Sequence, residues 1–185
     1  MTALSTNPGG APPSSARRLR PVKLAIGDAV VHPTHGVGRV VARENRAVGG
    51  KKEPVVVVAL AEGLTVSLPL DRAESQLRPL ASEADLQRVR TTLRQEAVPP
   101  EKAWLVRQRE LRDKLTSGSL LDLAEIVRDS APRQAAAAGG KGASGAEERD
   151  MFRKAYRLLS TEIATVRGIG PDEAERWIER QLARD

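Results

Sequence analysis

The pattern of apolar positions changes once along the chain, near residue 81. Residues 26–80 hold short apolar runs, rich in Val and partly alternating, separated by Gly- and Pro-containing turn signals. Such runs predict β-strands. We expect strands at 29–32, 37–43, 55–60 and 64–69, and a short fifth strand near 77–80. Short strands joined by tight turns predict a small barrel of the SH3 or Tudor type.

Helical spacing replaces this pattern after Ser82, which we expect to be a helix N-cap with acidic residues in the first turn. Further helices are predicted at about 101–115, ending at Gly118, and at 120–128, and two more follow residue 146. Ser144 and Glu147 form the pattern of a capping box. The Ala/Gly-rich residues 131–146 predict a flexible loop.

These patterns predict an α+β protein of two modules: a small Tudor- or SH3-like β barrel, then an all-α bundle of about five helices. We place the β module at 24–80 and the helical module at 81–185. Residues 1–23 carry four basic groups and no acid, and we expect them to form a disordered basic tail.

The charge distribution points to a polyanionic partner. The net charge is +6 and the pI is about 10.1. Outside the tail, the excess positive charge lies in residues 86–114 and 149–167, whereas residues 168–185 are net acidic. Most of the cations are Arg, whose forked guanidinium suits phosphate oxygens.

The sequence gives little indication of a catalytic or metal-binding site. The 185 residues contain no Cys and only two His, His32 and His35, in one turn. A metal would need further ligands in matching geometry, and no catalytic set is recognisable. We expect a protein that is not an enzyme and has no metal and no cofactor. Because no apolar run is long enough to span a bilayer and no signal peptide begins the chain, we expect a cytoplasmic location.

A resemblance emerges from the motifs in order. The β module opens with GDAVVHP (27–33) and HGVG (35–38) and continues with GLTV (63–66), LP (68–69) and LR (77–78). The second half holds Trp104, Arg107, KL (114–115), SG (117–118) and LAEIVRD (123–129). Over roughly residues 24–183 the chain resembles the CarD/CdnL family of bacterial transcription regulators. Its β module is also similar to the polymerase-binding domain of transcription-repair coupling factors.

The resemblance implies a division of labour between the modules. The β module would dock on the RNA polymerase β subunit, and the helical module would reach promoter DNA at the upstream edge of the transcription bubble. There Trp104 would wedge into the minor groove and stabilise the open complex, with Arg107 and Arg109 on neighbouring phosphates. Arg153 and Arg157, four residues apart with no acid between them on that face, would add a phosphate contact.

In the β module, the resemblance assigns a polymerase contact to Arg46. Arg39 and Arg43 are neighbours at strand spacing, and an exposed strand edge could pair with a strand of the β subunit. The protein would act as a monomer associated with the nucleoid through RNA polymerase. His32 stands where many members have Tyr, and Ser67 stands where some have a basic residue.

Several alternatives remain open at this stage. Trp104 could be a core residue, because Leu111 and Leu115 share its helical stripe, and the arginines could form a solvated face. Trp177, with apolar neighbours at helical spacing, is expected in the core. The helical module could bind protein rather than DNA. An SH3-like protein that binds ribosomal RNA and a His-metal hydrolase are the remaining alternatives.

Overall fold

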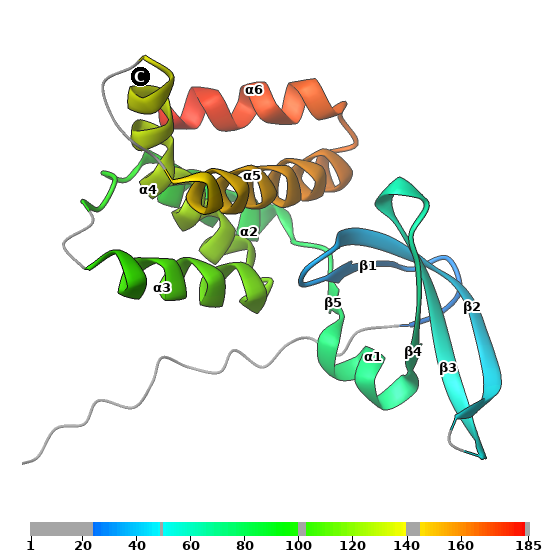
Figure 1. The fold of residues 1–185 in the computed structure, drawn as a ribbon. Helices are drawn as coiled ribbons and strands as arrows, with labels where there is room; N and C mark the ends of the chain where they lie inside the picture. Colours follow the sequence, from blue (N-terminus) through cyan, green and yellow to red (C-terminus); the bar gives the residue numbers. More distant parts are fainter. Residues whose placement is uncertain (1–23, 49, 100–102, 140–144, 184–185) are drawn as a thin grey trace, which may run out of the picture.

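The computed structural model describes residues 24–48, 50–99, 103–139 and 145–183, and it shows a β module beside a helical module (Figure 1). The two-module α+β class is therefore confirmed. The predicted basic tail, residues 1–23, lies outside the described residues.

The β module is an antiparallel sheet with the strand order β4-β3-β2-β1-β5. Its strands are β1 (Ala29–His32), β2 (Gly36–Val48), β3 (Lys51–Leu60), β4 (Thr65–Pro69) and β5 (Arg78–Pro79). Whereas β2 pairs with β3 as far as Val48, it pairs with β1 only over Gly36–Arg39. The β2–β3 hairpin therefore extends beyond the rest of the sheet (Figure 1).

A short helix that the sequence analysis did not predict closes the core of the β module. Helix α1 (Leu70–Gln76) follows β4, and Ala73 and Leu77 are buried against Val residues of the sheet. A 3-10 turn, η1 (Ala61–Gly63), joins β3 to β4. The spacing of Leu70, Ala73 and Leu77 is helical, but a seven-residue helix spans too few turns to stand out in a periodicity search.

Five helices in the described part of the chain enclose a second apolar core, as predicted. They are α2 (Glu83–Arg94), α3 (Trp104–Ser117), α4 (Leu120–Ala138), α5 (Ala146–Arg167) and α6 (Pro171–Leu182). Helix α5 lies in the middle: α3 packs on α4 and α5, and α6 packs on α5 and α2. Helices α3 and α6 therefore lie on opposite sides of α5 (Figure 1).

Local capping follows the sequence signals closely. Ser82 forms a capping box with Asp85, and Gly118 ends α3 in the left-handed conformation with φ +66°. Trp177 lies in the core with 8% of its surface exposed, as predicted, and the guanidinium carbon of Arg167 is 4.7 Å from its ring centroid.

The predicted loop at 131–146 is wrong in its first half. Helix α4 continues through Pro132 to Ala138. The proline removes one backbone donor. Arg133 stabilises this part of α4 by donating to Glu148 Oε1 of α5 (2.7 Å) and to Asp129 O of α4 (2.9 Å). The Ala-rich turn that follows also favours helix. Ser144 of the predicted capping box lies outside the described residues, and Gly145 is the N-cap of α5.

The two modules meet at a close-packed junction. The β1–β2 turn approaches the α3–α4 turn so closely that a Cβ at Gly118 would lie 2.7 Å from Pro33 Cα. A Cβ at Gly36 would lie 2.9 Å from Leu158 Cδ2 of α5. An ion pair crosses the same junction: Arg78 donates to both carboxylate oxygens of Glu162, at 2.6 and 2.7 Å.

Candidate functional site

The N-terminal end of α3 exposes apolar side chains. Trp104 is the first helical residue, and its side chain lies outside what the structure describes. The next two residues are Leu105 and Val106, with 71% and 47% of their surfaces exposed. Only further along the helix do Leu111 and Leu115 enter the core. The first turn of α3 is therefore an apolar surface open to a partner.

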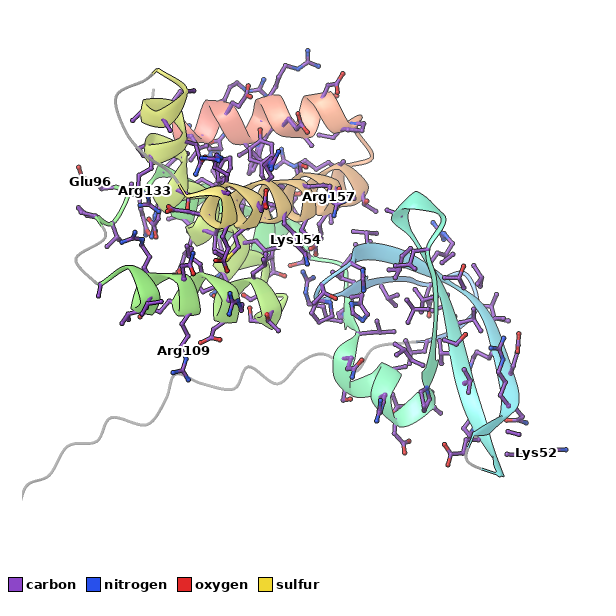
Figure 2. The ribbon with its side chains drawn as sticks, viewed as in Figure 1. Lys52, Glu96, Arg109, Arg133, Lys154 and Arg157 are labelled. Atoms are coloured by element: carbon purple, nitrogen blue, oxygen red, sulfur yellow. The ribbon has the colours of Figure 1, made fainter. Side chains whose placement is uncertain are left out.

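The two predicted arginines on α3 differ in their surroundings. Arg107 is half-buried, whereas Arg109 is exposed and points away from the rest of the bundle (Figure 2). Within the described residues, Arg109 makes no hydrogen bond or ion pair. Arg112 pairs with Glu147 of α5 at 2.5 Å, which leaves Arg109 as the cation most available beside the apolar turn.

The second predicted phosphate contact, Arg153 with Arg157, has an acid one turn before it. Arg153 is exposed on α5 and forms an ion pair with Asp150, one turn before it on the same helix. An acid therefore does accompany this face, because the i,i+3 neighbour lies on the same side of a helix as the i,i+4 neighbour. Arg157 is exposed as well and lies on the same helix (Figure 2).

The three predicted arginines of the β module lie on β2, but not on one face. The register shifts between Val40 and Ala42, so that Arg39 opposes Ala59 and Arg43 opposes Val56. Opposed residues share a face, and Ala59 and Val56 lie on opposite faces of β3. The bulge therefore separates Arg39 from Arg43, which the strand spacing had placed together.

The same register puts Arg46 on the face of Arg39. Arg46 opposes Glu53, which is six residues from Ala59 on β3 and so shares its face. Arg46 pairs with Glu44 at 2.8 Å and donates to Ser67 Oγ at 3.3 Å, while Arg39 donates to Gly27 O at 2.6 Å. Arg39 and Arg46 therefore share a face of the hairpin but have separate partners, and the acids Glu44 and Glu53 accompany Arg46.

The two histidines pack against each other near the module junction. The ring centroids of His32 and His35 are 4.8 Å apart, and Thr34 N donates to His32 Nδ1 at 3.2 Å. Burial, and secondly the neighbouring His35, lower the pKa of His32. No group of three potential metal ligands occurs among the described residues. Nor does any helix in that part of the chain have the length and apolar character needed to cross a membrane.

Comparisons with known proteins agree with this arrangement. A family model described as the CarD-like/TRCF RID domain matches residues 24–81, and one described as the CarD C-terminal domain matches residues 88–179. YdeB of Bacillus subtilis (strain 168), named as a candidate transcription factor, is 27% identical over 146 residues. That match covers 78% of this chain and 92% of YdeB. The two family models follow the order of the two modules.

Proposed function

The chain belongs to the CarD family of transcription regulators, and we propose that it stabilises the open promoter complex by holding RNA polymerase with one module and DNA with the other. The N-terminal module is of the kind that interacts with RNA polymerase. The particular subunit, the DNA contact and the effect on the open complex are the proposal.

The polymerase contact would be made by the β2–β3 hairpin on the β subunit. Beyond Val40, one edge of β2 has no partner among the described strands, so its backbone groups are free to pair with a strand of another protein. Arg46 on one face and Arg43 on the other flank this edge, and Arg39 lies just before it, where β2 still pairs with β1. An open strand edge with cations on both faces suits a strand that carries acidic side chains.

The DNA contact would be made by the first turn of α3. The observation that carries it is the exposure of Leu105 and Val106 directly after Trp104, beside Arg109, which pairs with none of the described residues. Minor-groove proteins insert apolar wedges between base steps and hold the distorted DNA with cations. In this arrangement Trp104 is the wedge, and Arg107 and Arg109 contact adjacent phosphates.

Arg153 and Arg157 on α5 would supply further phosphate contacts. The ion pair of Arg153 with Asp150 is exposed, with side-chain exposures of 75% and 66%. Such a pair contributes roughly 0–1 kcal/mol, so it costs little to exchange the carboxylate for a phosphate. The two arginines extend the basic surface from α3 to its neighbour α5.

Stabilisation of the open state requires a preference for distorted DNA. A contact that bound closed and open DNA equally would shift nothing. A wedge fits only the opened step, whereas the polymerase-bound module raises the effective concentration of the wedge at the promoter. Polymerase binding by the β module and stabilisation of opened DNA by the helical module can therefore be measured separately.

We predict that Trp104→Ala shortens the lifetime of the open complex and leaves polymerase binding unchanged, because it removes the wedge alone. Competitor-challenge lifetimes and co-purification with polymerase measure the two quantities. Arg46→Glu is the reciprocal variant: it should lose the β subunit and keep binding to a forked DNA. An unchanged lifetime for Trp104→Ala, or retained co-purification for Arg46→Glu, would contradict the corresponding contact.

A second candidate function is a polymerase-bound adaptor whose helical module binds protein. The exposed apolar side chains of Leu105 and Val106 favour it, since apolar anchors also form the centres of protein interfaces. Binding to fork DNA at two salt concentrations separates the candidates. A DNA-binding module loses affinity steeply as salt rises, whereas the adaptor would show no fork binding at either concentration.

A further inference from the structure

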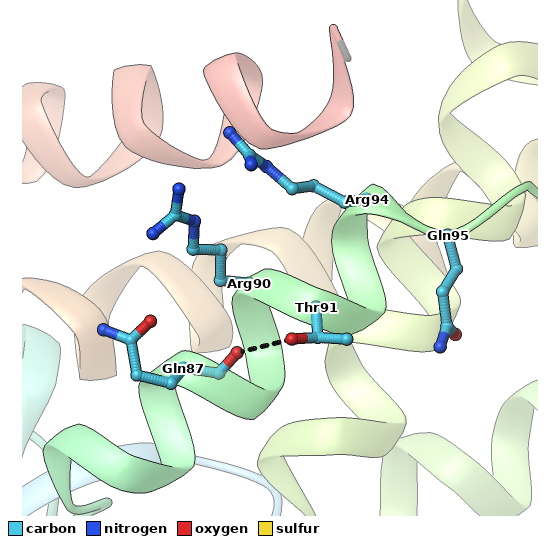
Figure 3. Close-up of a pocket in the computed structure, with 5 residues that line it drawn as sticks. All are labelled: Gln87, Arg90, Thr91, Arg94 and Gln95. Atoms are coloured by element: carbon cyan, nitrogen blue, oxygen red, sulfur yellow. Dashed lines mark hydrogen bonds between the residues drawn. The ribbon is translucent and has the colours of Figure 1, made fainter. Parts of the chain in front are cut away.

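A second basic surface lies on the other side of the helical module, along helix α2. A shallow hollow there is lined by Gln87, Arg90, Thr91, Arg94 and Gln95 (Figure 3). Every one of these side chains is polar or charged. Both guanidinium groups point from α2 toward α6 (Figure 3).

Contacts with the core hold one of these arginines in place. Arg94 Nε donates to Gln181 Oε1 of α6 at 3.0 Å. Gln181 is buried, with 6% of its surface exposed, and its Nε2 donates to Trp177 O at 3.1 Å. The guanidinium of Arg94 is therefore oriented by a buried amide and keeps its two terminal nitrogens for another acceptor.

Helix α6 adds two more arginines near this hollow, beside four acidic residues of its own. Its other flank, with Glu175 and Glu179, faces α5, because Tyr156 Oη of α5 donates to Glu175 O at 3.4 Å. Burial, followed by those two carboxylates, raises the pKa of Tyr156 to about 12. At roughly 100° per residue, Arg180 lies about 100° around α6 from Gln181, the residue that accepts from Arg94 of α2, and Arg176 lies about 140° from it.

The resulting α2–α6 arginine surface (Arg90, Arg94, Arg176 and Arg180) has acidic neighbours on its α6 side, where Asp172, Glu173 and Glu179 lie three or four residues from Arg176. All four residues are exposed, and within the described residues Arg90, Arg176 and Arg180 have no hydrogen bond or ion pair. Both pairs are like charges at i,i+4, which destabilise a helix. On α2, Glu83 pairs with Arg167 at 3.1 Å and Asp85 forms the capping box with Ser82, so the acids nearest to this surface are those of α6.

We propose that the α2–α6 arginine surface binds the phosphate backbone of duplex DNA. The inference rests on the proposed function for the identity of the polyanion. Protein interfaces have apolar and aromatic residues at their centres, and this hollow has none. Interfaces with nucleic acid are more polar and more positive, and the guanidinium fork matches phosphate oxygens.

The position of the surface makes it a second DNA contact. Helices α3 and α6 lie on opposite sides of α5, so the surface and the apolar turn of α3 face different directions (Figure 1). One straight duplex lying against α3 does not reach α6. DNA held at both places therefore bends around the module or is a second segment, and it is read through its backbone alone.

The test compares two arginines on one helix. Arg90 and Arg88 are two residues apart, about 200° around the helix, and both are exposed; Arg88 lies 3.9 Å from Asp85. We expect Arg90→Gln to lower the slope of log affinity against log salt for a blunt duplex by roughly 0.9, the share of one phosphate contact. Arg88→Gln should change it little, and Arg176→Gln combined with Arg180→Gln should lower it by about twice that amount. Equal slopes for Arg90→Gln and Arg88→Gln would overturn the proposal.

A positional measurement completes the experiment. Because the chain has no cysteine, Arg90→Cys and Arg88→Cys each give a unique site for a photo-activated crosslinker. We expect crosslinks to duplex DNA from position 90 and few from position 88. Failure of the proposed function is distinguishable, because it would appear as unchanged open-complex lifetime for Trp104→Ala. Equal crosslinking from the two positions would instead contradict DNA binding by the α2–α6 arginine surface, without contradicting the role proposed for Trp104.

Discussion

Gln108 is a buried amide on the core-facing side of α3. It is 8% exposed and shares its stripe with Leu111 and Leu115, and its Nε2 has no hydrogen-bond partner among the described residues. A buried donor without a partner costs its desolvation free energy, about 1–3 kcal/mol. One turn after Trp104, α3 is therefore attached less firmly than at Leu111 and Leu115.

We predict that Gln108→Leu raises the free energy of unfolding by about 1 kcal/mol, because it replaces an unsatisfied amide by an apolar side chain of similar size. Urea unfolding followed by circular dichroism measures it. Gln87→Leu is the matched control: its exposed amide bonds Glu83 Oε1 at 3.2 Å, so little change is expected. A loss of stability for Gln108→Leu would show that the amide is satisfied in solution.

Individual residues also show where sequence reasoning reaches its limit. The arginines of β2 were found as candidates, but their faces were not, because the bulge at Val41 changes the parity of every later position. The pairing of Arg153 with Asp150 follows an i,i+3 spacing, which is a local pattern in the sequence. The exposure of Leu105 cannot be predicted from the sequence, because it depends on which face of α3 packs against the other helices.

At the scale of elements, caps and periodicity predicted the order of strands and helices, whereas long-range contacts decided the ends. Helix α2 begins after Ser82 and helix α3 ends at Gly118, as expected, because the signals of both caps are local. Pro132 did not end α4, since Arg133 reaches Glu148 in α5, a contact that no local pattern reveals. Helix α4 therefore extends beyond its predicted end for a tertiary reason.

The turn between α3 and α4 offers a test of that tertiary contribution. Gly118 and Gly168 both end helices in the left-handed conformation, with φ +66° and +64°. A Cβ at Gly168 would meet nothing within 4 Å, whereas one at Gly118 would lie 2.7 Å from Pro33 Cα and Cβ. We predict that Gly168→Ala loses roughly 1–2 kcal/mol of stability, and Gly118→Ala about 1–3 kcal/mol more, because the modules must move apart.

Thermal and urea unfolding of the two glycine variants provides the comparison. Equal losses would mean that only the backbone conformation matters and that the junction yields to an added methyl group. The larger loss at Gly118 would show that the β1–β2 turn and the α3–α4 turn are packed against each other in solution.

For the whole molecule, the question is how a hairpin that holds polymerase is kept at a fixed position relative to the wedge on α3. The ion pair between Arg78 and Glu162 at the junction holds the two modules in this position. Arg78 also donates to Gly118 O at 2.8 Å, and Glu162 Oε1 also accepts from Ala81 N at 3.1 Å. The pair thus joins β5, the start of the helical module, the α3–α4 turn and α5. A sequence separation of 84 residues placed it outside any local inference.

We predict that Glu162→Gln uncouples the modules. The side chains of Glu162 and Arg78 are 1% and 16% exposed, and loss of one partner from a buried pair costs about 3–5 kcal/mol, because the other charge stays desolvated. Arg112→Gln is the control, since its pair with Glu147 has exposures of 65% and 45% and should contribute roughly 0–1 kcal/mol. Polymerase binding and fork binding, measured separately, should survive Glu162→Gln, while the open-complex lifetime falls, since the linked contacts no longer meet at high effective concentration. If Glu162→Gln preserved both the stability and the lifetime, the orientation of the modules would have to be set by the turn packing at Gly118 and Gly36 alone.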